Sequence, residues 1–442
     1  MSSTFHAEPY LSWGRVQRGD HLVARPQHRA ELPGLLAEAA SSTVLGGGLS
    51  RSYGDSGLDS DGRLISGRDL NRFISLDLET GILRGEAGLS LGEILQVSVP
   101  RGWFLPTTPG TRFVTLAGAV ANDVHGKNHH VAGSLGCHVR KIGLIRSDRG
   151  RLELSPETEK ALFEATLGGL GLTGFIEWVE LQLVPVPSGF LDQEAVGFSG
   201  IDGYFDLLED SHQRFEHVAA WIDCAATGRK LGRGVLFRAN WSREGGWLAH
   251  SPRPKLSVPF EAPGWLLNPL SIKTFNVAYN DLYSSRPGIQ RVAYASAFYP
   301  LDAIGGWNKL YGSRGFFQHQ SVIPPGTERE TLRKMLEAIS ASGQGSFLAV
   351  LKTMGDKRSA GVVSFPMAGA SLALDFPNRG ASTLALLERL DGLVSEADGR
   401  VYPAKDSRMS AAVFQKGFPR WNDLEALRDP LFLSAFWRRV TT

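Results

Sequence analysis

The chain has 442 residues, a length that suits two or three domains. Hydrophobic residues make up 42% and charged residues 21% of the sequence, as in an ordinary soluble enzyme. The 47 basic and 45 acidic residues leave a net charge of +2 with no basic block, so nothing indicates a nucleic-acid partner.

Cysteine usage and hydropathy bear on where the protein works. Cys137 and Cys224 lie far apart and form neither a disulfide framework nor a zinc pattern, which fits a reducing compartment. The N-terminus lacks the apolar core of a signal peptide, and no run approaches eighteen apolar residues. We therefore expect a cytoplasmic protein without a transmembrane helix.

The first half of the chain predicts short elements. A helix is expected at residues 28–40, followed by a strand in STVLGGG that runs into glycines. Short strands and turns are expected to alternate in four stretches between residues 63 and 105: RLISG, FISLDLETGILRGEAG, LSLGEIL and GWFLP. A helix at 157–166 and a strand at 175–186 follow, and PVPSG then indicates a boundary.

Longer strands are expected in the second half: HVAAWIDC, RGVLFRAN, ASAFYPL, FFQHQSVIP, SFLAVLK and GVVSF…SLALDF. Helices are expected at 328–340 and 382–397. This pattern predicts an antiparallel sheet backed by helices, an α+β fold. The Pro-rich residues 251–270 predict a mobile loop with exposed apolar side chains.

Two glycine-rich stretches differ in what they predict. GGGLSRSYGD (46–55) follows a strand, and successive glycines can point their N–H groups into one concavity that suits a pyrophosphate. The alternative is a tight turn between strands. GLGLTG (169–174) matches G-x-G-x-x-G, but a helix precedes it and a strand follows it, which is the reverse of the Rossmann order.

Three histidines and a lysine fall within six residues in NDVHGKNHH (122–130), after the small residues of LAGAVA (116–121). Small residues permit a flat ring system to lie against backbone. The cluster allows three interpretations: a metal site, a structural histidine cluster, or the polar wall of a cofactor or substrate pocket. Gly126 interrupts the spacing and no acidic third ligand accompanies it, so we favour the polar wall.

Six motifs occur in order: GGGLSRSYGD, PGTRFVTLAGAVANDVHGKNHH, GGLGLTGFIE, FFQHQSVIP, SFLAVLK and RVYPAKDSR. Together they resemble the FAD-dependent decaprenylphosphoryl-β-D-ribose 2-oxidases of the vanillyl-alcohol-oxidase superfamily, over nearly the whole chain. HGKNHH and YPAKDSR are the most specific of them. The resemblance implies a two-lobed FAD-binding domain over 1–186, completed by 400–442, with an inserted antiparallel-sheet substrate domain over 187–399.

The resemblance also implies site residues. It assigns FAD binding to Gly46, Gly47, Gly48, Leu49, Ser50, Arg51, Ser52, Tyr53, Gly54, Asp55, Ser56, Gly110, Thr115, Leu116, Ala117, Gly118, His125, Gly126, Lys127, Asn128, Ile176 and Tyr402. It assigns substrate contacts to Tyr53, His125, Lys127, Trp221, Gln318, Gln320, Lys352 and Lys405. FAD should be non-covalent, because Arg51 stands where tethering relatives carry a histidine.

Lys405 is the leading candidate to deprotonate the substrate hydroxyl, with His125 next, since a desolvated lysine near other cations has a lowered pKa. Its alternative is a surface lysine paired with Asp406, and core packing is the alternative for Trp221. Three positions depart from the family pattern: a cysteine of the mycobacterial members falls on Ala373, an aromatic on Met354 and an asparagine on Ser371.

The implied reaction oxidises the 2-hydroxyl of a polyprenyl-phosphoryl ribose to a ketone, with hydride transfer to the flavin. A separate NAD(P)H-dependent reductase would complete an epimerisation to arabinose for cell-wall glycans. Three alternatives stay open: an oxidase of a free sugar, alditol or aldonolactone, a flavin-binding protein without turnover, and a metallohydrolase.

A lipid-linked substrate implies peripheral contact with the inner face of the plasma membrane, because a long isoprenoid does not leave the bilayer readily. Two segments are candidates for that contact. Residues 255–270 carry Phe260, Trp265, Leu266 and Leu267, and residues 431–440 carry three aromatics before two arginines. For the second segment, packing on the FAD-binding domain is the favoured alternative.

Overall fold

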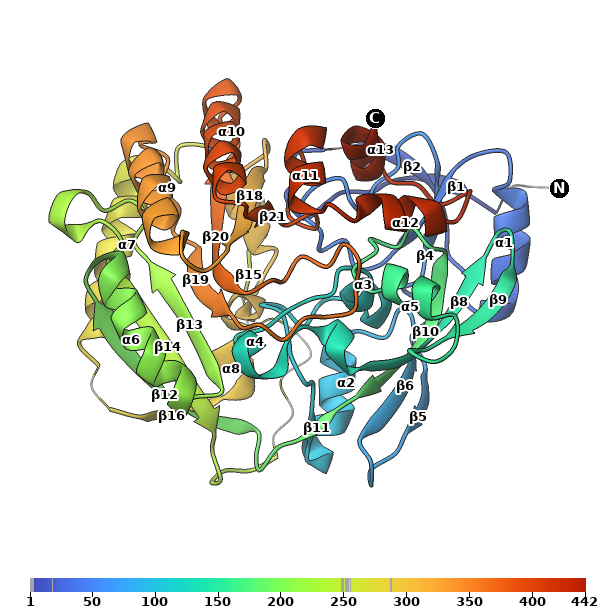
Figure 1. Ribbon diagram of the computed structural model, residues 1–442, viewed down its shortest axis with the longest axis horizontal. Helices are drawn as coiled ribbons and strands as arrows, with labels where there is room; N and C mark the ends of the chain where they lie inside the picture. Colours follow the sequence, from blue (N-terminus) through green and yellow to red (C-terminus); the bar gives the residue numbers. More distant parts are fainter. Residues whose placement is uncertain (1–3, 18, 248–249, 251–253, 255, 287) are drawn as a thin grey trace.

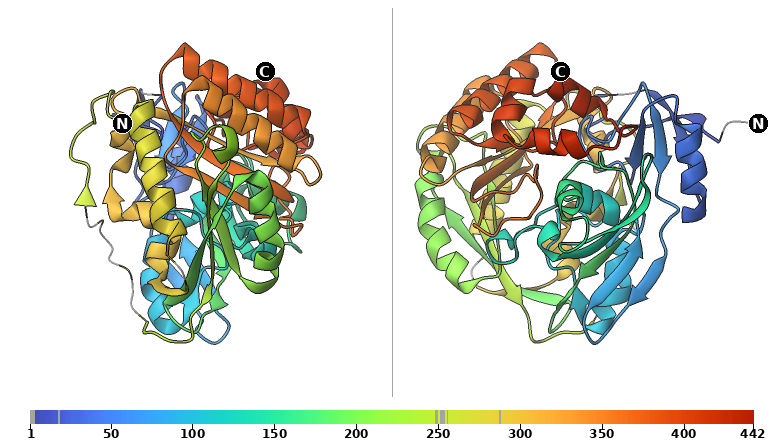
Figure 2. Two further views of the ribbon diagram at one scale, coloured as in Figure 1. Left: turned by 90° about the vertical axis from the view of Figure 1, so that its left-hand side faces the viewer. Right: turned by 45° about the vertical axis from the view of Figure 1, so that its right-hand side comes forward.

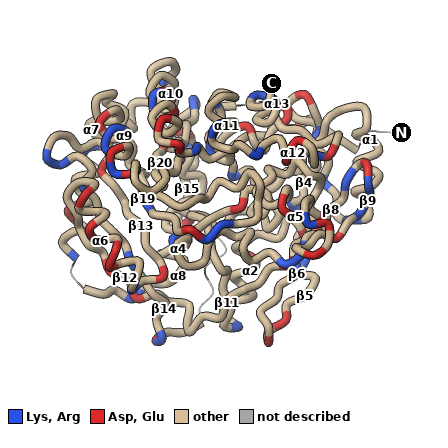
Figure 3. Tube along the Cα trace, in the orientation of Figure 1, with Lys and Arg blue, Asp and Glu red and all other residues tan. Residues whose placement is uncertain are grey.

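The computed structural model describes residues 4–17, 19–247, 250, 254, 256–286 and 288–442. A large sheet with its helices lies on one side in Figure 1, and the N-terminal sheets lie on the other. The last helices of the chain cross the top of the N-terminal part. Basic and acidic residues are interspersed over the described trace (Figure 3).

Two small sheets form the N-terminal part. A mixed four-stranded sheet has the order β1 (His6–Pro9), β2 (Asp20–Ala24), β4 (Arg63–Ser66) and β3 (Val44–Gly47). An antiparallel five-stranded sheet has the order β5 (Phe73–Leu76), β6 (Ile82–Glu86), β10 (Phe175–Gln182), β8 (Val139–Arg146) and β9 (Gly150–Leu154). A two-stranded ribbon pairs β7 (Trp103–Phe104) with β11 (Val184–Pro185).

Short helices connect these strands. They are η1 (Arg29–Glu31), α1 (Leu32–Glu38), α2 (Leu91–Ser98), η2 (Val99–Arg101), α3 (Leu116–Ala121), α4 (His129–Ala132), η3 (Leu135–His138) and α5 (Lys160–Thr166). The helix expected at 28–40 is confirmed as η1 followed by α1, and the one at 157–166 as α5. GLGLTG is confirmed as a turn from α5 into β10, the reverse of a Rossmann unit.

An eight-stranded antiparallel sheet dominates the rest of the chain. Its order is β16 (Gln290–Ala293), β12 (Phe190–Phe198), β14 (Gly234–Trp241), β13 (His217–Ile222), β19 (Ala349–Met354), β20 (Gly369–Pro377), β18 (Phe316–Ile323) and β21 (Arg400–Val401). The apolar residues of one face pack against α6 (Gly200–Arg214), α9 (Glu328–Ser342) and α10 (Ala381–Glu396) to form the largest core. The antiparallel sheet and its helices confirm the α+β prediction.

The opposite face of this sheet is partly covered by α7 (Pro269–Ser284), which stands along its outside in the left view of Figure 2. Strand register gives the uncovered part of this face its polar character. Gln318 lies opposite Asp375 and Gln320 opposite Ala373 across β18 and β20, and Lys352 lies opposite Ser371 across β19 and β20. Directly opposed residues share a face, so these side chains gather on one surface.

Small elements complete the chain. They are η4 (Gly228–Lys230), β15 (Leu256–Ser257), α8 (Tyr294–Phe298), η5 (Pro300–Ala303), β17 (Ile304–Gly305), η6 (Trp307–Tyr311), α11 (Ala411–Gly417), α12 (Trp421–Leu427) and α13 (Ala435–Thr441). Part of the predicted loop at 251–270, residues 251–253 and 255, lies outside the described residues. No helix in the described ranges is long and apolar enough to cross a bilayer.

The C-terminal segment packs on the N-terminal part. Phe432, Phe436 and Trp437 are each no more than 1% exposed. Phe432 forms a bridge to Val44 of β3, and the amide of Phe436 donates to the carbonyl of Asp55. The hypothesis that residues 431–440 dock on a membrane is therefore wrong. The alternative, that this segment packs on the FAD-binding domain, is confirmed.

Three strand predictions are wrong. LSLGEIL forms helix α2, because Ser90 caps it and Glu93 completes a capping box. ASAFYPL becomes α8 and the start of η5, and GVVSF is irregular before β20 begins. Helices α6 and α7 were not anticipated, and α7 begins inside the Pro-rich stretch with Asn268 as its cap and Pro269 in its first turn.

Candidate active site

The glycine loop after β3 approaches helix α3 with bare backbone. A Cβ on Gly48 would lie 2.6 Å from Oγ1 of Thr115, and one on Gly47 would lie 2.8 Å from the hydroxyl of Tyr10. Only glycine permits such approaches. Thr115 caps α3 through the amide of Gly118, so the loop and the small-residue helix lie side by side and offer backbone rather than side chains to a ligand.

Side chains of this loop hold the loop itself. Ser50 has a positive φ of 53°, and its hydroxyl accepts a hydrogen bond from Arg68 at 2.9 Å. Arg51 donates from Nε to the carbonyl of Phe113 at 3.1 Å, and its guanidinium lies 4.1 Å from the ring centroid of Trp13. These contacts hold the loop in place and do not test the assignment of Ser50 and Arg51 to FAD, which stays a prediction.

The glycine loop also touches the YPAKDSR segment, although some 350 residues separate them. The amide of Tyr53 donates to the carbonyl of Ala404 at 2.9 Å. A Cβ on Gly54 would clash with the carbonyl oxygen of Asp406. The glycine loop and the YPAKDSR segment therefore meet beside Lys405.

His125 stands at the centre of a buried polar cluster. Its Nδ1 lies 2.5 Å from Nζ of Lys352, and its Nε2 lies 3.1 Å from the amide nitrogen of Gln320. The ring lies 5.7 Å from both Phe365 and Tyr402, which stack on each other. Burial, and then the charge of Lys352, keep the pKa of His125 well below its usual value, so the imidazole is neutral at neutral pH.

A neutral imidazole has one donor and one acceptor, which couples it to Lys352. A charged Lys352 can only donate to Nδ1, which leaves the ring proton on Nε2 and requires Gln320 to present its amide oxygen. An uncharged Lys352 can instead accept from Nδ1–H, which lets Gln320 donate to Nε2. Burial lowers the pKa of Lys352 to about 7, with Lys127 and Lys405 adding repulsion, so both arrangements are accessible.

Two more lysines share this region, and both are half-buried like Lys352. Lys127 donates to the carbonyl of Ala297 at 2.6 Å, and burial lowers its pKa to about 8. Burial also lowers the pKa of Lys405 to about 8, opposed by the carboxylate of Asp375. Its Nζ lies 3.9 Å from the ring centroid of Tyr53. Three lysines that repel one another make a site suited to an anion.

Asp375 is the site residue that the sequence reasoning missed. It is 1% exposed and accepts a hydrogen bond from Gln318. Burial raises its pKa, and the hydrogen bond of Gln318 and the charge of Lys405 oppose that rise. The only sequence signal is its period-2 spacing from Ala373 and Ser371, which places the three on one strand face.

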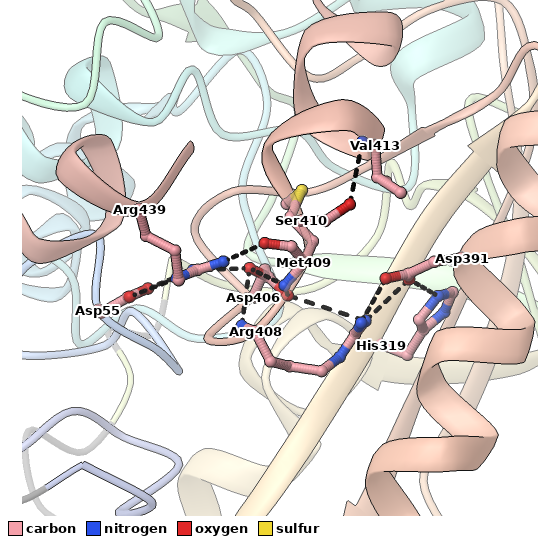
Figure 4. Close-up of polar contacts among 9 residues, drawn as sticks. All are labelled: Asp55, His319, Asp391, Asp406, Arg408, Met409, Ser410, Val413 and Arg439. Carbon is pink, nitrogen blue, oxygen red and sulfur yellow. Dashed lines mark hydrogen bonds and ion pairs between the residues drawn. The ribbon is translucent and has the colours of Figure 1, made fainter. Parts of the chain in front are cut away.

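Behind Lys405, a second polar network fixes the YPAKDSR segment (Figure 4). Arg439 of α13 donates to Asp55 at 2.9 and 3.0 Å and to Asp406 at 2.9 Å. Asp406 also accepts from the amide of Met409 at 3.0 Å. Since Asp406 pairs with arginine, the alternative that Lys405 is a surface lysine paired with Asp406 is wrong.

The same network reaches the glutamine strand. Arg408 lies 3.8 Å from Asp406 and forms an ion pair with Asp391 of α10. Asp391 in turn lies 3.1 Å from Nε2 of His319, which sits between Gln318 and Gln320 and points to the other sheet face. One hydrogen-bonded chain therefore ties the lysine segment to the strand that carries both glutamines.

Some predicted residues lie apart from this cluster. Trp221 shares the sheet face but donates to the carbonyl of Phe347 at 3.0 Å and packs 4.7 Å from the ring of Tyr279. These contacts favour the packing interpretation. Ile176 belongs to the core beneath the five-stranded sheet, and a Cβ on Gly110 would meet no atom within 4 Å. Met354 is buried in the main core.

The remaining histidines of NDVHGKNHH separate in role. His130 stacks 4.0 Å from His212 and bonds the carbonyl of Phe215, a structural arrangement. His129 is 2% exposed, and neither ring nitrogen has a hydrogen-bond partner among the described residues. Within those residues, no three or more His, Cys, Asp or Glu side chains are placed to hold a metal ion.

Comparison with known proteins assigns the class. The family model for an FAD binding domain matches residues 21–154, which include the glycine loop, α3 and the histidine motif. The chain is an FAD-dependent oxidoreductase. It is 35% identical to the decaprenylphosphoryl-beta-D-ribose oxidase of Mycolicibacterium smegmatis, with 91% of this chain and 90% of the relative covered. The chain therefore belongs to the decaprenylphosphoryl-β-D-ribose oxidase family.

Two other relatives show how far along the chain the similarity extends. An uncharacterised protein of Streptomyces coelicolor is 31% identical, covering 80% of this chain and all of the relative. A putative D-arabinono-1,4-lactone oxidase of Neurospora crassa is 30% identical over only 123 residues, which cover 28% of this chain and 22% of the relative. The similarity to the lactone oxidase is thus local, whereas the similarity to the ribose oxidase extends over nearly the whole chain.

Proposed function

We propose that this enzyme oxidises the 2-hydroxyl of a polyprenyl-phosphoryl ribose to a keto sugar, as the first half of an epimerisation. The observation that carries the proposal is the cluster of three half-buried lysines beside two glutamines on one sheet face. Cations suit a phosphate, and amides suit sugar hydroxyls. The family relationship, which extends over this face and the FAD-binding part, supports the same substrate class.

The residues around the glycine loop fit FAD. A Cβ on Gly47 or Gly48 would run into the hydroxyl of Tyr10 or Oγ1 of Thr115, so the loop keeps bare backbone there. Bare backbone N–H groups suit a diphosphate. The ring of Tyr402 beside His125 gives the flavin site an aromatic wall. Bound FAD supplies the hydride acceptor.

We expect FAD to be bound without a covalent link. Arg51 is held by the carbonyl of Phe113 and the ring of Trp13, and a guanidinium does not form the bond that a histidine makes in tethering relatives. Denaturing the purified protein in acid should release all the yellow colour into the supernatant. Flavin that precipitates with the chain would show the expectation to be wrong.

In this proposal, Lys405 takes the proton of the hydroxyl. A pKa of about 8 leaves a usable uncharged fraction at neutral pH, and the carboxylate of Asp375 stabilises the ammonium that forms. Lys127 and Lys352 bind the substrate phosphate, while Gln318 and Gln320 orient the sugar. A separate NAD(P)H-dependent reductase then reduces the ketone from the other face.

A 2-deoxy analogue gives the sharpest test. Under anaerobic conditions, a short-chain prenylphosphoryl ribose should bleach the flavin absorbance of the purified enzyme. The 2-deoxyribose analogue should perturb the spectrum on binding without bleaching it, because no hydroxyl remains to be oxidised. Bleaching by the 2-deoxy compound would move the reaction to another hydroxyl, and bleaching only by ribitol or an aldonolactone would favour a free-sugar oxidase.

A further inference from the structure

One stretch of the surface concentrates exposed apolar side chains. Among the described residues, the five most exposed large hydrophobic side chains all lie between residues 256 and 289. They are Leu256, Phe260, Trp265, Leu270 and Ile289, each 66–73% exposed. Four of them fall within residues 256–270, and the remainder of helix α7 separates Ile289 from these four. Single apolar residues scattered over a protein surface are normal, whereas several gathered in one segment mark an interaction site.

Hydrogen bonds fix the segment that carries these exposed side chains. Asn268 caps α7, and its side-chain oxygen accepts from the amides of Leu270 and Ser271 at 2.9 and 3.0 Å. The amide of Ala262 donates to the carbonyl of Lys309 at 2.9 Å, which anchors the preceding loop. Helix α7 buries only Ile272 and Asn276, so most of its surface faces away from the sheet (Figure 2, left view).

Two arginines lie at the base of this apolar surface. A small cleft of about 50 Å³ is lined by Leu267 and Tyr311 together with Arg314 and Arg379. Arg379 donates to the carbonyl of Leu267 at 3.1 Å, and Arg314 is exposed. Neither arginine forms an ion pair with a described residue, whereas Glu261 of the loop is paired with Arg15. Unpaired cations beneath aromatic side chains complement anionic headgroups.

A row of packed aromatic rings lies between the cleft and the active site. Tyr311 stacks 4.1 Å from Phe316, and Phe316 packs 5.4 Å from Tyr53, whose ring lies beneath the ammonium of Lys405. The cleft and the lysine cluster therefore lie at the two ends of one aromatic core.

We propose that the exposed apolar side chains of Leu256, Phe260, Trp265 and Leu270, together with the Arg314–Arg379 cleft, form a docking surface for an anionic lipid bilayer. The inference rests on the proposed function for its purpose, because only a lipid-linked substrate requires it. Docking is reversible, since a few interfacial side chains and two cations hold it, and its strength depends on the anionic lipid content.

Sedimentation with vesicles tests the docking surface. The FAD-loaded protein should bind vesicles of phosphatidylcholine with 30% phosphatidylglycerol and bind pure phosphatidylcholine poorly. Arg314→Gln with Arg379→Gln should weaken binding by roughly thirtyfold, at about one headgroup interaction per arginine. Trp265→Ser with Leu266→Ser should weaken it at least as much. Leu384→Ser with Arg389→Gln, two exposed positions on α10, is the matched control and should bind like the parent.

Reduction by a short-chain soluble substrate separates this inference from the proposed function. All variants should reduce their flavin at the parental rate. A parent that never binds the anionic vesicles, or variants that bind like the parent, would overturn the docking surface. Loss of reduction in the double arginine variant would make the cleft a substrate-phosphate site and also overturn it. Intact vesicle binding without any reduction by prenylphosphoryl ribose would instead count against the proposed function alone.

Discussion

Two polar clusters lie on either side of Lys405, and their charge balance differs. The cluster in front holds three lysines against one carboxylate, and burial lowers the pKa of each lysine. The network behind holds Arg408 and Arg439 against three aspartates. Despite their burial, hydrogen bonds and charges from those aspartates raise the pKa of both arginines.

This difference in charge balance indicates different roles: the lysine cluster is the reactive surface, and the arginine–aspartate network is its structural support. A satisfied ion-pair network keeps its charges over a wide pH range and fixes geometry. An unbalanced set of buried cations is costly without an anion, and it provides groups that exchange protons near neutral pH. Such groups are suited to bind a phosphate and accept a proton. The following changes test this division.

Arg439→Gln should have the largest effect. It removes the cation between Asp55 and Asp406, which are 2% exposed each, so Asp55 loses this ion pair and Asp406 keeps only the more distant Arg408 at 3.8 Å. We expect the free energy of unfolding to fall by about 3 kcal/mol in urea titrations. Arg420→Gln, which breaks an exposed pair with Asp423, should cost about 1 kcal/mol or less. Equal losses in the two variants would contradict the support role.

Lys405→Ala should retain its fold and its FAD yet lose flavin reduction by at least about a hundredfold, as expected for removal of a general base. Stopped-flow absorbance under anaerobic conditions measures the rate. Lys416→Ala, an exposed lysine of α11, is the control and should react normally. Near-normal reduction in the Lys405 variant would transfer the base role to His125.

Asp375→Asn should shift the pH dependence of reduction with a smaller change in rate. Lys405 acts as a base only when uncharged, so the parental rate falls as the pH drops through about 8. The Asp375 carboxylate raises the pKa of Lys405, and asparagine removes that charge while keeping an oxygen for Gln318. The variant should therefore keep its activity to lower pH. A profile that does not move, or moves upward, would remove Asp375 from the proton path.

The smallest expected effect concerns Ala373, where we expect no covalent labelling by an inhibitor. Nitroaromatic inhibitors that capture the cysteine of the mycobacterial relatives should leave the intact mass of this enzyme unchanged after turnover, because only a thiolate reacts readily. Ala373 lies opposite Gln320 across β18 and β20, so Ala373→Cys should place a thiol in the pocket and gain the adduct. An adduct on the parental β20 peptide would refute this assignment.

Local sequence explains how much of this site could be predicted. The glycine loop, HGKNHH and YPAKDSR each concentrate unusual residues within ten positions, and the structure brings His125, Lys352, Gln320 and Lys405 into one region. Asp375 could not be found in this way, because its importance comes from pairing with Gln318 across two strands. The local sequence around a single aspartate in an apolar strand does not show which residues lie opposite it on the neighbouring strand.

The fold shows the same limit. Strand β10 was predicted from the period-2 alternation that one buried face leaves. Strand β13 is buried at every position and was predicted as a short, nearly continuous apolar run. LSLGEIL was misread since its short apolar run fits either state, and the Ser90–Glu93 capping box decides for a helix. Helix α7 was not predicted, because most of its apolar residues are exposed and it buries only Ile272 and Asn276.

The pH dependence of flavin reduction by a short-chain prenylphosphoryl ribose tests the central claim most directly. If the unbalanced lysine cluster is the active site, the rate should rise with pH through about 8 as Lys405 loses its proton, and ribitol or an aldonolactone should not substitute. A pH-independent rate, or bleaching only by the free alditol or lactone, would contradict the account.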